Sequence, residues 1–306
     1  MRILLFGAGG YLGSALARHF KDSGHEVAVL ARDDEKAAAF QAAGLTPVAG
    51  DLDHINALAE PIAQADAVVF ASAIPFDREW PIFSEILALM KGSGKTFVMT
   101  SGTGVLSHET PLGEWRQETY AEDEPFTPPP WIALRVETEN RVRAFSSEGV
   151  RTMVVRPPQI WGNNGSKQIP ALFEGVQASG AACYIGRGLN LYTHVHVDDL
   201  AEVYRLALER GQPGALYHAV AGEACWKSIA EAVAVVMNCP ARSVSIDEAK
   251  TIWGEFIGPL FFGVSSRSRA VRTRAELGWS PTHFDVVDDV RNGSYSVRGV
   301  HQQTAF

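Results

Sequence analysis

The stretch Met1–Gly13, MRILLFGAGGYLG, decides the fold of this chain. An apolar run over residues 3–6 is typical of a short buried strand, and Gly7, Gly10 and Gly13 follow it before apolar residues recur at helical spacing. Strand, glycine turn and helix predict a dinucleotide-binding opening, because glycine allows a tight turn, close approach of a pyrophosphate and close helix packing. The free N–H groups at the helix start would hold the phosphates. The predicted cofactor contacts here are Gly7, Gly9, Gly10, Tyr11, Leu12 and Gly13.

The composition is that of an ordinary globular protein. Its 306 residues suit one large α/β unit or two small lobes, and 46% of them are hydrophobic. A net charge of −8 argues against a nucleic-acid or anionic-membrane partner. The N-terminus carries no basic leader and no uncharged run is long enough to span a bilayer, so we expect a cytoplasmic protein. The expected partner is a small-molecule substrate, with a homodimer left open.

Cysteine and histidine give no reason to expect a metal. Cys183, Cys225 and Cys239 are an odd number without a C-x-x-C pattern, so neither a disulfide framework nor a zinc site is indicated. His194 and His196 lie two residues apart and share one face of a predicted strand. No third ligand is evident, so we expect no metal.

The end of the second predicted strand bears on the choice of cofactor. In this architecture that strand end meets the adenosine ribose, where an acid suits a free 2′-hydroxyl and an arginine suits a 2′-phosphate. Arg32 comes first here and Asp33 and Asp34 follow. This order favours NADP(H) and leaves NAD(H) open, and the alternative is that Arg32 is only a solvated loop charge.

Further strands and helices alternate along the chain. Strands are expected at 47–49, 67–70, 96–100 and 152–155, which predicts a parallel sheet with ligands at the carboxyl ends of its strands. Asp51 would either accept from an adenine amino group or cap the next helix. The other cofactor contacts that these strand ends predict are Arg32, Asp51, Leu52, Ala71, Ser72 and Ala73.

These patterns predict an α/β protein with a doubly wound parallel sheet of the Rossmann type. The polar, proline-rich segment 108–130 is too long for a routine connection, so we expect a flap or rim beside the site. The expected divisions are a cofactor domain over 1–157 to which 190–210 returns, a substrate lobe over 158–189 and 211–293, and a frayed tail over 294–306.

Six motifs follow one another along nearly the whole chain: FGAGGYLG at 6–13, GDL at 50–52, VVFASA at 68–73, FVMTSG at 97–102, VVRPPQIWG at 154–162 and HVDDLA at 196–201. In this order they resemble the extended or atypical short-chain dehydrogenase/reductases, also described as the NAD-dependent epimerase/dehydratase family. The resemblance implies a Rossmann domain with a smaller, interleaved C-terminal substrate lobe, and further cofactor contacts at Arg135 and Pro157.

The resemblance also implies a catalytic motif that this chain lacks. In the family, a Ser or Thr after the fifth strand orients the substrate, and a Tyr-x-x-x-Lys on the next helix exchanges the proton. The alignment places Trp131 at the tyrosine and Arg135 at the lysine, and no tyrosine of the chain has a lysine four residues later. Gly102 takes the hydroxyl position, between Ser101 and Thr103. The catalytic candidates are therefore Ser101, Thr103, Trp131 and Arg135.

Side-chain chemistry limits what the replacements can do. An indole N–H donates a hydrogen bond without giving up its proton near neutral pH, and arginine stays charged. Hydride transfer remains feasible because the cofactor carries that step. The proton would come from water or a neighbouring substrate hydroxyl, or else from Tyr120 or His108. The substrate-contact candidates are Trp131, Gln159, Trp161 and Tyr120.

Our leading hypothesis is an NADP(H)-dependent oxidoreductase, specifically a ketoreductase acting on a bulky, partly apolar small molecule. Trp115, Trp131 and Trp161 would form an aromatic pocket edge. One alternative is a nucleotide-sugar epimerase, and another is a non-catalytic NADP(H) sensor that binds a protein partner. Dehydration is disfavoured, because Thr103 and Gly104 stand where related dehydratases carry an Asp-Glu pair.

Overall fold

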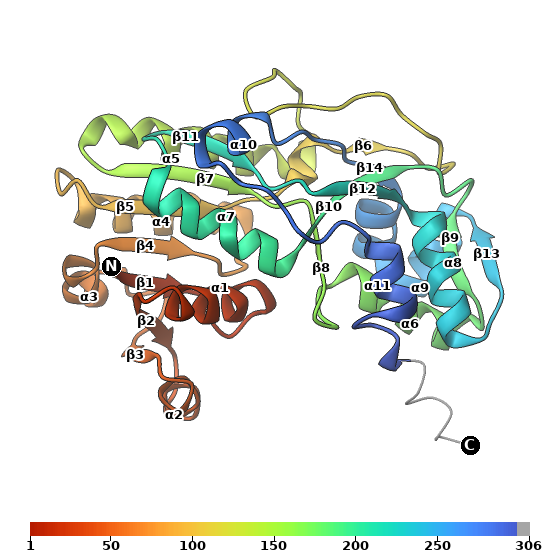
Figure 1. The fold of residues 1–306 in the computed structure, drawn as a ribbon. Helices are drawn as coiled ribbons and strands as arrows, with labels where there is room; N and C mark the ends of the chain where they lie inside the picture. Colours follow the sequence, from red (N-terminus) through yellow and green to blue (C-terminus); the bar gives the residue numbers. More distant parts are fainter. Residues whose placement is uncertain (299–306) are drawn as a thin grey trace.

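The computed structural model describes residues 1–298, which form a seven-stranded sheet and a smaller lobe beside it (Figure 1). The strand order is β11-β7-β5-β4-β1-β2-β3 and each of these pairings is parallel, so the predicted Rossmann sheet is confirmed. The order reverses between β1 and β4, where ligands bind at the carboxyl ends of the strands. The strands are β1 (Arg2–Phe6), β2 (Glu26–Ala31), β3 (Thr46–Ala49), β4 (Ala67–Phe70), β5 (Thr96–Thr100), β7 (Arg151–Arg156) and β11 (Ala215–His218).

Alternating side chains give the sheet two buried faces. Ile3 and Leu5 of β1 pack with the first group of helices, whereas Leu4 and Phe6 pack with the second. The first group comprises α1 (Tyr11–Asp22) and α7 (Val197–Arg210), and the second comprises α3 (Ala59–Gln64), α4 (Phe76–Met90) and α5 (Ala133–Ala144). The helix α2 (Asp34–Ala42) contacts β2 and β3. Helices on both faces leave only the strand ends open to a ligand.

The second lobe has a core of its own, to the right of the sheet in Figure 1. Its helices are α6 (Gln168–Ser179), α8 (Trp226–Met237), α9 (Ile246–Ile257) and α11 (Val286–Asn292). Its strands are β8 (Gln159–Trp161), β9 (Ala182–Ile185), β10 (Leu191–His196), β12 (Gly222–Cys225) and β13 (Ala241–Val244), with the short β6 (His108–Glu109) and β14 (Val264–Ser265) pairing nearby. In the described part of the chain, no helix is both long and apolar enough to cross a membrane.

Two expected divisions of the chain need correction. The range 211–293, expected in the substrate lobe, contains β11, which pairs with β7 as the edge strand of the main sheet. It also contains α10 (Val271–Leu277), whose Leu277 packs in the core between the sheet and α7. Tyr295, expected in a frayed tail, is fully buried because its ring packs in the core of the second lobe. Residues 299–306 of that tail lie outside the described residues.

The segment 108–130 is fastened to the rest of the molecule by a buried carboxylate. Glu122 is 3% exposed and accepts hydrogen bonds from the backbone N–H groups of Val271, Arg272 and Thr273 at 3.1, 3.1 and 3.0 Å. The hydroxyl of Thr273 adds a fourth at 3.0 Å. These donors are the otherwise unpaired N–H groups at the start of α10. The segment is therefore anchored to the start of α10 at this point.

Glu122→Gln is expected to lower the free energy of unfolding by about 2–3 kcal/mol, because charge-assisted hydrogen bonds are lost and an amide N–H₂ faces backbone donors. The matched control is Glu124→Gln, which breaks an exposed ion pair with Arg269 and should change the free energy of unfolding far less than Glu122→Gln. Urea unfolding followed by circular dichroism measures both. Equal losses in the two variants would contradict this role of Glu122.

Candidate active site

The glycine turn between β1 and α1 has the geometry of a phosphate cradle. Gly7 has φ +95°, and a Cβ there would lie 2.6 Å from the backbone nitrogen of Ser72. A Cβ at Gly13 would lie 1.9 Å from the carbonyl oxygen of Gly7. Gly10 is the N-cap of α1 and offers no side-chain cap, so the first N–H groups of the helix stay free. The turn therefore fits the pyrophosphate of a dinucleotide.

The residues expected at the adenosine end lie after β2 and β3. Arg32 is exposed and has no ion pair within residues 1–298. Asp33 is occupied as the N-cap of α2, since it accepts from the backbone nitrogen of Lys36 at 2.8 Å. Asp51 accepts hydrogen bonds from the His54 ring and from the backbone nitrogen of Asp53, the latter at 2.8 Å. These two hydrogen bonds, that of His54 first, hold the pKa of the Asp51 carboxyl below its usual range. Arg32 is thus an uncommitted positive charge beside this end of the cradle.

Small residues continue the cradle after β4. The backbone nitrogen of Ala71 donates to Phe6 at 2.9 Å, and the neighbouring backbone of Ser72 approaches Gly7. Across β5, the carbonyl of Pro157 accepts from the backbone of Thr103 at 2.9 Å. Leu52, by contrast, packs against the sheet core. The predicted contacts Ala71, Ser72, Ala73 and Pro157 therefore all follow carboxyl ends of neighbouring strands.

Trp131 and Arg135 lie on one helical turn at the end of β5. Trp131 belongs to a 3₁₀ turn over Pro130–Ile132, ahead of α5, because the preceding prolines disfavour an earlier α-helical start. Its ring centroid is 6.3 Å from that of Phe76 and 6.0 Å from that of Phe256 in the other lobe. The Arg135 guanidinium lies 5.0 Å from the Phe76 ring and donates to the carbonyl of Thr100 at 3.2 Å.

Arg135 is paired with a carboxylate that the sequence did not point to. Glu79, on the first turn of α4, lies 2.8 Å from Arg135 and is 1% exposed. Burial raises the pKa of Glu79 to about 7 despite the arginine. Glu79 Oε2 and Arg135 Nε are both buried without a hydrogen-bond partner in the described residues. Buried polar atoms are rarely left unpaired, so this pair suits a ligand with hydroxyl or carbonyl groups.

Ser101 points into a buried network behind the site. Its hydroxyl donates to Glu139, which also binds the Arg156 guanidinium, with Nε 3.0 and 3.1 Å from the two carboxylate oxygens. His218 lies 3.4 Å from Arg156, and burial together with this arginine lowers the histidine pKa to about 4. Glu139 lies on α5 and Arg156 at the end of β7, so no local spacing in the sequence pairs them. The hydroxyl of Ser101 is therefore engaged away from the cradle.

Two expected site residues are core residues instead. Thr103 is 1% exposed, and its backbone carbonyl accepts from the Ser266 hydroxyl at 2.7 Å, so its side chain does not line a pocket. Trp161 is 3% exposed because its indole packs in the second core and donates to His194 Nδ1 at 3.1 Å. Trp115, expected with it at the pocket edge, is exposed on the surface, 5.7 Å from the guanidinium of Arg267.

Gln159 and the two strand histidines complete the list of expected residues. Gln159 is 1% exposed, and neither polar atom of its amide has a partner within residues 1–298. His194 accepts from Trp161, and His196 accepts from the backbone of Asp198 at 3.2 Å. In the described residues, no group of three or more His, Cys, Asp or Glu side chains is arranged to hold a metal ion.

A loop from the second lobe lies against the first residue of α1. The Tyr11 hydroxyl donates to the carbonyl of Gly162 at 2.7 Å, so only the backbone of Tyr11 is available to a phosphate. The Tyr295 hydroxyl accepts from the nitrogen of Gly162 at 2.9 Å and donates to Gly165 at 2.8 Å. Left-handed backbone conformations allow this close approach and are found at Gly162, Asn163, Asn164 and Ser166.

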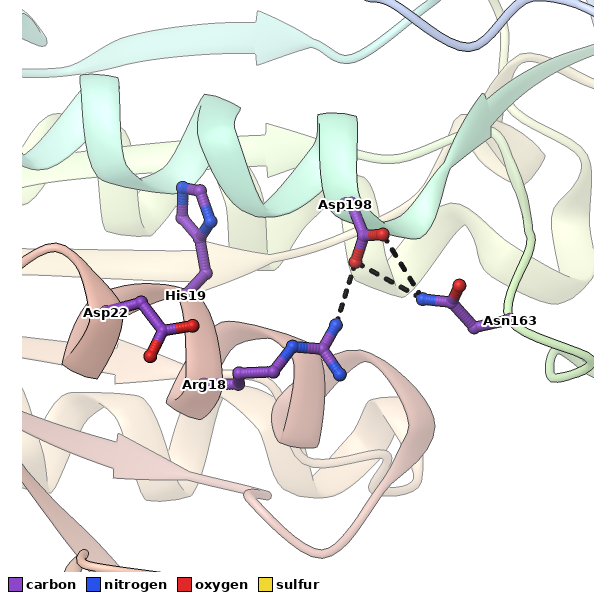
Figure 2. A pocket seen from close by; sticks show the side chains of 5 residues that line it. All are labelled: Arg18, His19, Asp22, Asn163 and Asp198. Atoms are coloured by element: carbon purple, nitrogen blue, oxygen red, sulfur yellow. Dashed lines mark hydrogen bonds and ion pairs between the residues drawn. The ribbon is translucent and has the colours of Figure 1, made fainter.

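Figure 2 shows where this loop is tied to α1 and α7. Arg18 donates to Asp198 at 2.8 Å, and the Asn163 amide lies 3.3 Å from both oxygens of the same carboxylate. His19 and Asp22 line the same polar hollow, in which Arg18 and Asn163 both bind Asp198. These contacts fasten the loop to the cradle helix.

A parallel sheet with a glycine-lined, uncapped helix start at its switch point, joined to a second lobe, defines a Rossmann-type dinucleotide-binding protein. The chain belongs to the NAD dependent epimerase/dehydratase family, whose profile matches residues 3–221. The family resemblance drawn from the six motifs is thereby confirmed.

Three relatives illustrate the range of similar proteins. An uncharacterised protein of Schizosaccharomyces pombe is 33% identical over 308 residues, 96% of this chain and 100% of the relative. The 4-hydroxy-2-methyl-3-oxo-4-farnesyl-3,4-dihydroquinoline-1-oxide ketoreductase of Stigmatella aurantiaca is 30% identical over 71% of this chain and 67% of its own length. The structure of a dTDP-glucose 4,6-dehydratase from Streptomyces venezuelae with NAD and TYD bound matches with a TM-score of 0.77 and 20% identity, covering 99% of this chain and 98% of that one.

Proposed function

We propose that this protein is an NADP(H)-dependent oxidoreductase that reduces a carbonyl group on a bulky, partly apolar small molecule. The observation that carries the proposal is the position of Trp131. It lies one helical turn from Arg135 at the end of β5, and its ring meets Phe76 of the Rossmann domain and Phe256 of the second lobe. Aromatic side chains from both lobes therefore meet at Trp131, and such a surface suits an apolar substrate body.

The named relative supports the same chemistry. The ketoreductase of Stigmatella aurantiaca acts, by its name, on a farnesyl-bearing quinoline oxide. That molecule is large, mostly apolar and carries an oxo group. The aromatic border at Trp131 and Phe256 is consistent with a substrate of this general kind. A ketoreductase is thus preferred over a nucleotide-sugar epimerase for this chain.

Each part of the site has a task in this reaction. When bound, the nicotinamide cofactor supplies the hydride. The glycine turn holds the phosphates, and Arg135, fixed by Glu79 and the carbonyl of Thr100, offers N–H donors at the end of β5. The indole of Trp131 shapes the pocket and can donate a hydrogen bond to the substrate oxygen. Neither Trp131 nor Arg135 gives up a proton near neutral pH.

Purified protein with NADPH and a panel of apolar ketones tests the proposal. We expect tight NADPH binding by fluorescence titration and loss of reduced-cofactor absorbance with at least one bulky ketone. Binding without turnover of any carbonyl would contradict the oxidoreductase proposal and favour the NADP(H) sensor. Turnover of nucleotide sugars alone, without net loss of NADPH, would favour the epimerase.

Arg32→Ser is expected to weaken NADPH binding by about 10-fold or more while leaving NADH binding nearly unchanged. A charge-assisted contact to a phosphate is worth about 1.5–3 kcal/mol, and 1.4 kcal/mol is a factor of ten. Fluorescence titration with each cofactor gives the two dissociation constants. Arg2→Gln is the matched control. Arg2 begins β1, at the end of the strand opposite the glycine turn, and pairs with Asp66 at 3.7 Å. Equal effects of Arg32→Ser on both cofactors would contradict a 2′-phosphate role.

A further inference from the structure

Tyr120 and His108 form a hydrogen-bonded pair beside the Trp131 turn. His108 Nε2 and the Tyr120 hydroxyl oxygen lie 3.0 Å apart, and the two rings stack with centroids 5.9 Å apart at 19°. Tyr120 and Trp131 pack against one apolar cluster, whose buried members are Val105, Leu106 and Ile132. The phenol is half-buried, so the pair borders the aromatic edge of the site without being sealed from water.

Backbone pairing holds both His108 and Tyr120 in place. His108 belongs to β6, where it is paired with Ser265 of β14. The backbone of Tyr120 accepts from the nitrogen of Arg269 at 2.8 Å and donates to Arg267 at 3.2 Å. Segment 108–130 runs along the top of the molecule in Figure 1, and these bonds join it to the stretch that follows β14. The backbones of His108 and Tyr120 are therefore both held against the same stretch of chain, residues 265–269.

The electrostatic surroundings keep a proton on the phenol and a single proton on the imidazole. Burial lowers the pKa of His108, so the ring is neutral near pH 7 and carries one N–H. Burial and the Glu118 carboxylate raise the pKa of Tyr120. Glu118 and its partner Arg116 are the charged groups whose fields reach both rings. A neutral imidazole with its proton on Nε2 can donate to the phenol oxygen and would stabilise a phenolate there.

We propose that Tyr120 donates the proton in carbonyl reduction and that His108 positions it and stabilises its phenolate. This rests on the proposed function. Hydride from the reduced nicotinamide forms a C–H bond at the carbonyl carbon, and the π electron pair moves to the oxygen. The O–H bond of Tyr120 breaks as its proton passes to that oxygen, which yields the alcohol. The phenolate accepts from His108 Nε2–H until water returns a proton to it. An alkoxide is more basic than a phenolate, so the transfer is downhill.

Single-turnover reduction of a ketone from the panel, with matched NADPH titrations, tests the assignment. Tyr120→Phe is expected to slow reduction by about 100-fold or more, the usual contribution of a general acid, without changing the dissociation constant for NADPH. The control is Tyr184→Phe in β9, whose hydroxyl makes no hydrogen bond within the described residues. The Tyr184 variant should react at the wild-type rate.

Two substitutions at His108 separate positioning from packing. His108→Gln keeps an N–H donor and should retain most of the rate, whereas His108→Leu should lose about 10-fold and shift the alkaline limb of the pH profile. An unchanged rate in Tyr120→Phe, with active wild type, would overturn the role of Tyr120 and leave the oxidoreductase proposal standing. A lower rate caused only by weaker NADPH binding would also overturn it. Wild-type protein that binds NADPH and reduces no carbonyl would overturn both.

Discussion

Gly13→Ala is expected to weaken NADP(H) binding by about 10- to 100-fold. A Cβ at this position would lie 1.9 Å from the carbonyl oxygen of Gly7 and 2.5 Å from its carbonyl carbon. Both are backbone atoms of the cradle, so no side chain can move to make room. Overpacking of this kind costs about 1–3 kcal/mol, and every 1.4 kcal/mol is a tenfold change in affinity. The loss falls on cofactor binding because the strain displaces the turn that would hold the phosphates.

Fluorescence titration with NADPH measures the effect, and thermal unfolding shows whether the variant is folded. Ser14→Ala is a suitable control, since Ser14 lies on the exposed face of the same helix and its hydroxyl only bonds back to Tyr11. The control should bind within about twofold of wild type. Unaltered NADPH affinity in a folded Gly13→Ala protein would show that close packing of α1 on the turn is unnecessary for binding.

Most strands of the Rossmann sheet could be predicted from the sequence, because the patterns that indicate them are local. An apolar run followed by a break at Gly7 predicts β1 and the start of α1, and 67–70 and 96–100 match β4 and β5 residue for residue. The edge strand β11 was missed, since four residues of mixed polarity carry little periodicity. Its place in the sheet comes from pairing with β7, some sixty residues away in the sequence.

The candidate site could be predicted from the sequence only in part, for a related reason. The glycine turn lies between the first strand and the first helix, and Arg32 lies between the second strand and the second helix. The local sequence pattern is therefore enough to single out both as candidate cofactor contacts. Glu79, by contrast, is a candidate site residue only because it pairs with Arg135, which lies in another helix. Trp161, expected at the pocket edge, is buried in the second core, and its position depends on how that lobe packs around His194. Pairings between distant segments are what a single sequence hides.

Glu139→Gln is expected to lower the free energy of unfolding by about 3–5 kcal/mol, since it leaves the Arg156 guanidinium buried and unpaired. The lost carboxylate also accepts from Ser101, and the neighbouring His218 is neutral near pH 7 because its pKa is lowered to about 4. No other carboxylate takes over the charge of Arg156 within the described residues. Urea unfolding at neutral pH, read by circular dichroism, measures the loss.

Two further variants decide whether the unpaired charge is the cause. Glu137→Gln, two residues earlier on the same helix, breaks an exposed pair 3.9 Å from Arg141 and should cost below about 1 kcal/mol. Adding Arg156→Met to Glu139→Gln removes the stranded charge and should restore part of the stability. If the double variant is as unstable as the sum of the single changes, packing around Phe126 matters more than charge, because Phe126 lies 5.0 Å from the Arg156 guanidinium. Recovery of stability in the double variant would instead show that the buried Arg156 guanidinium needs Glu139 as its partner.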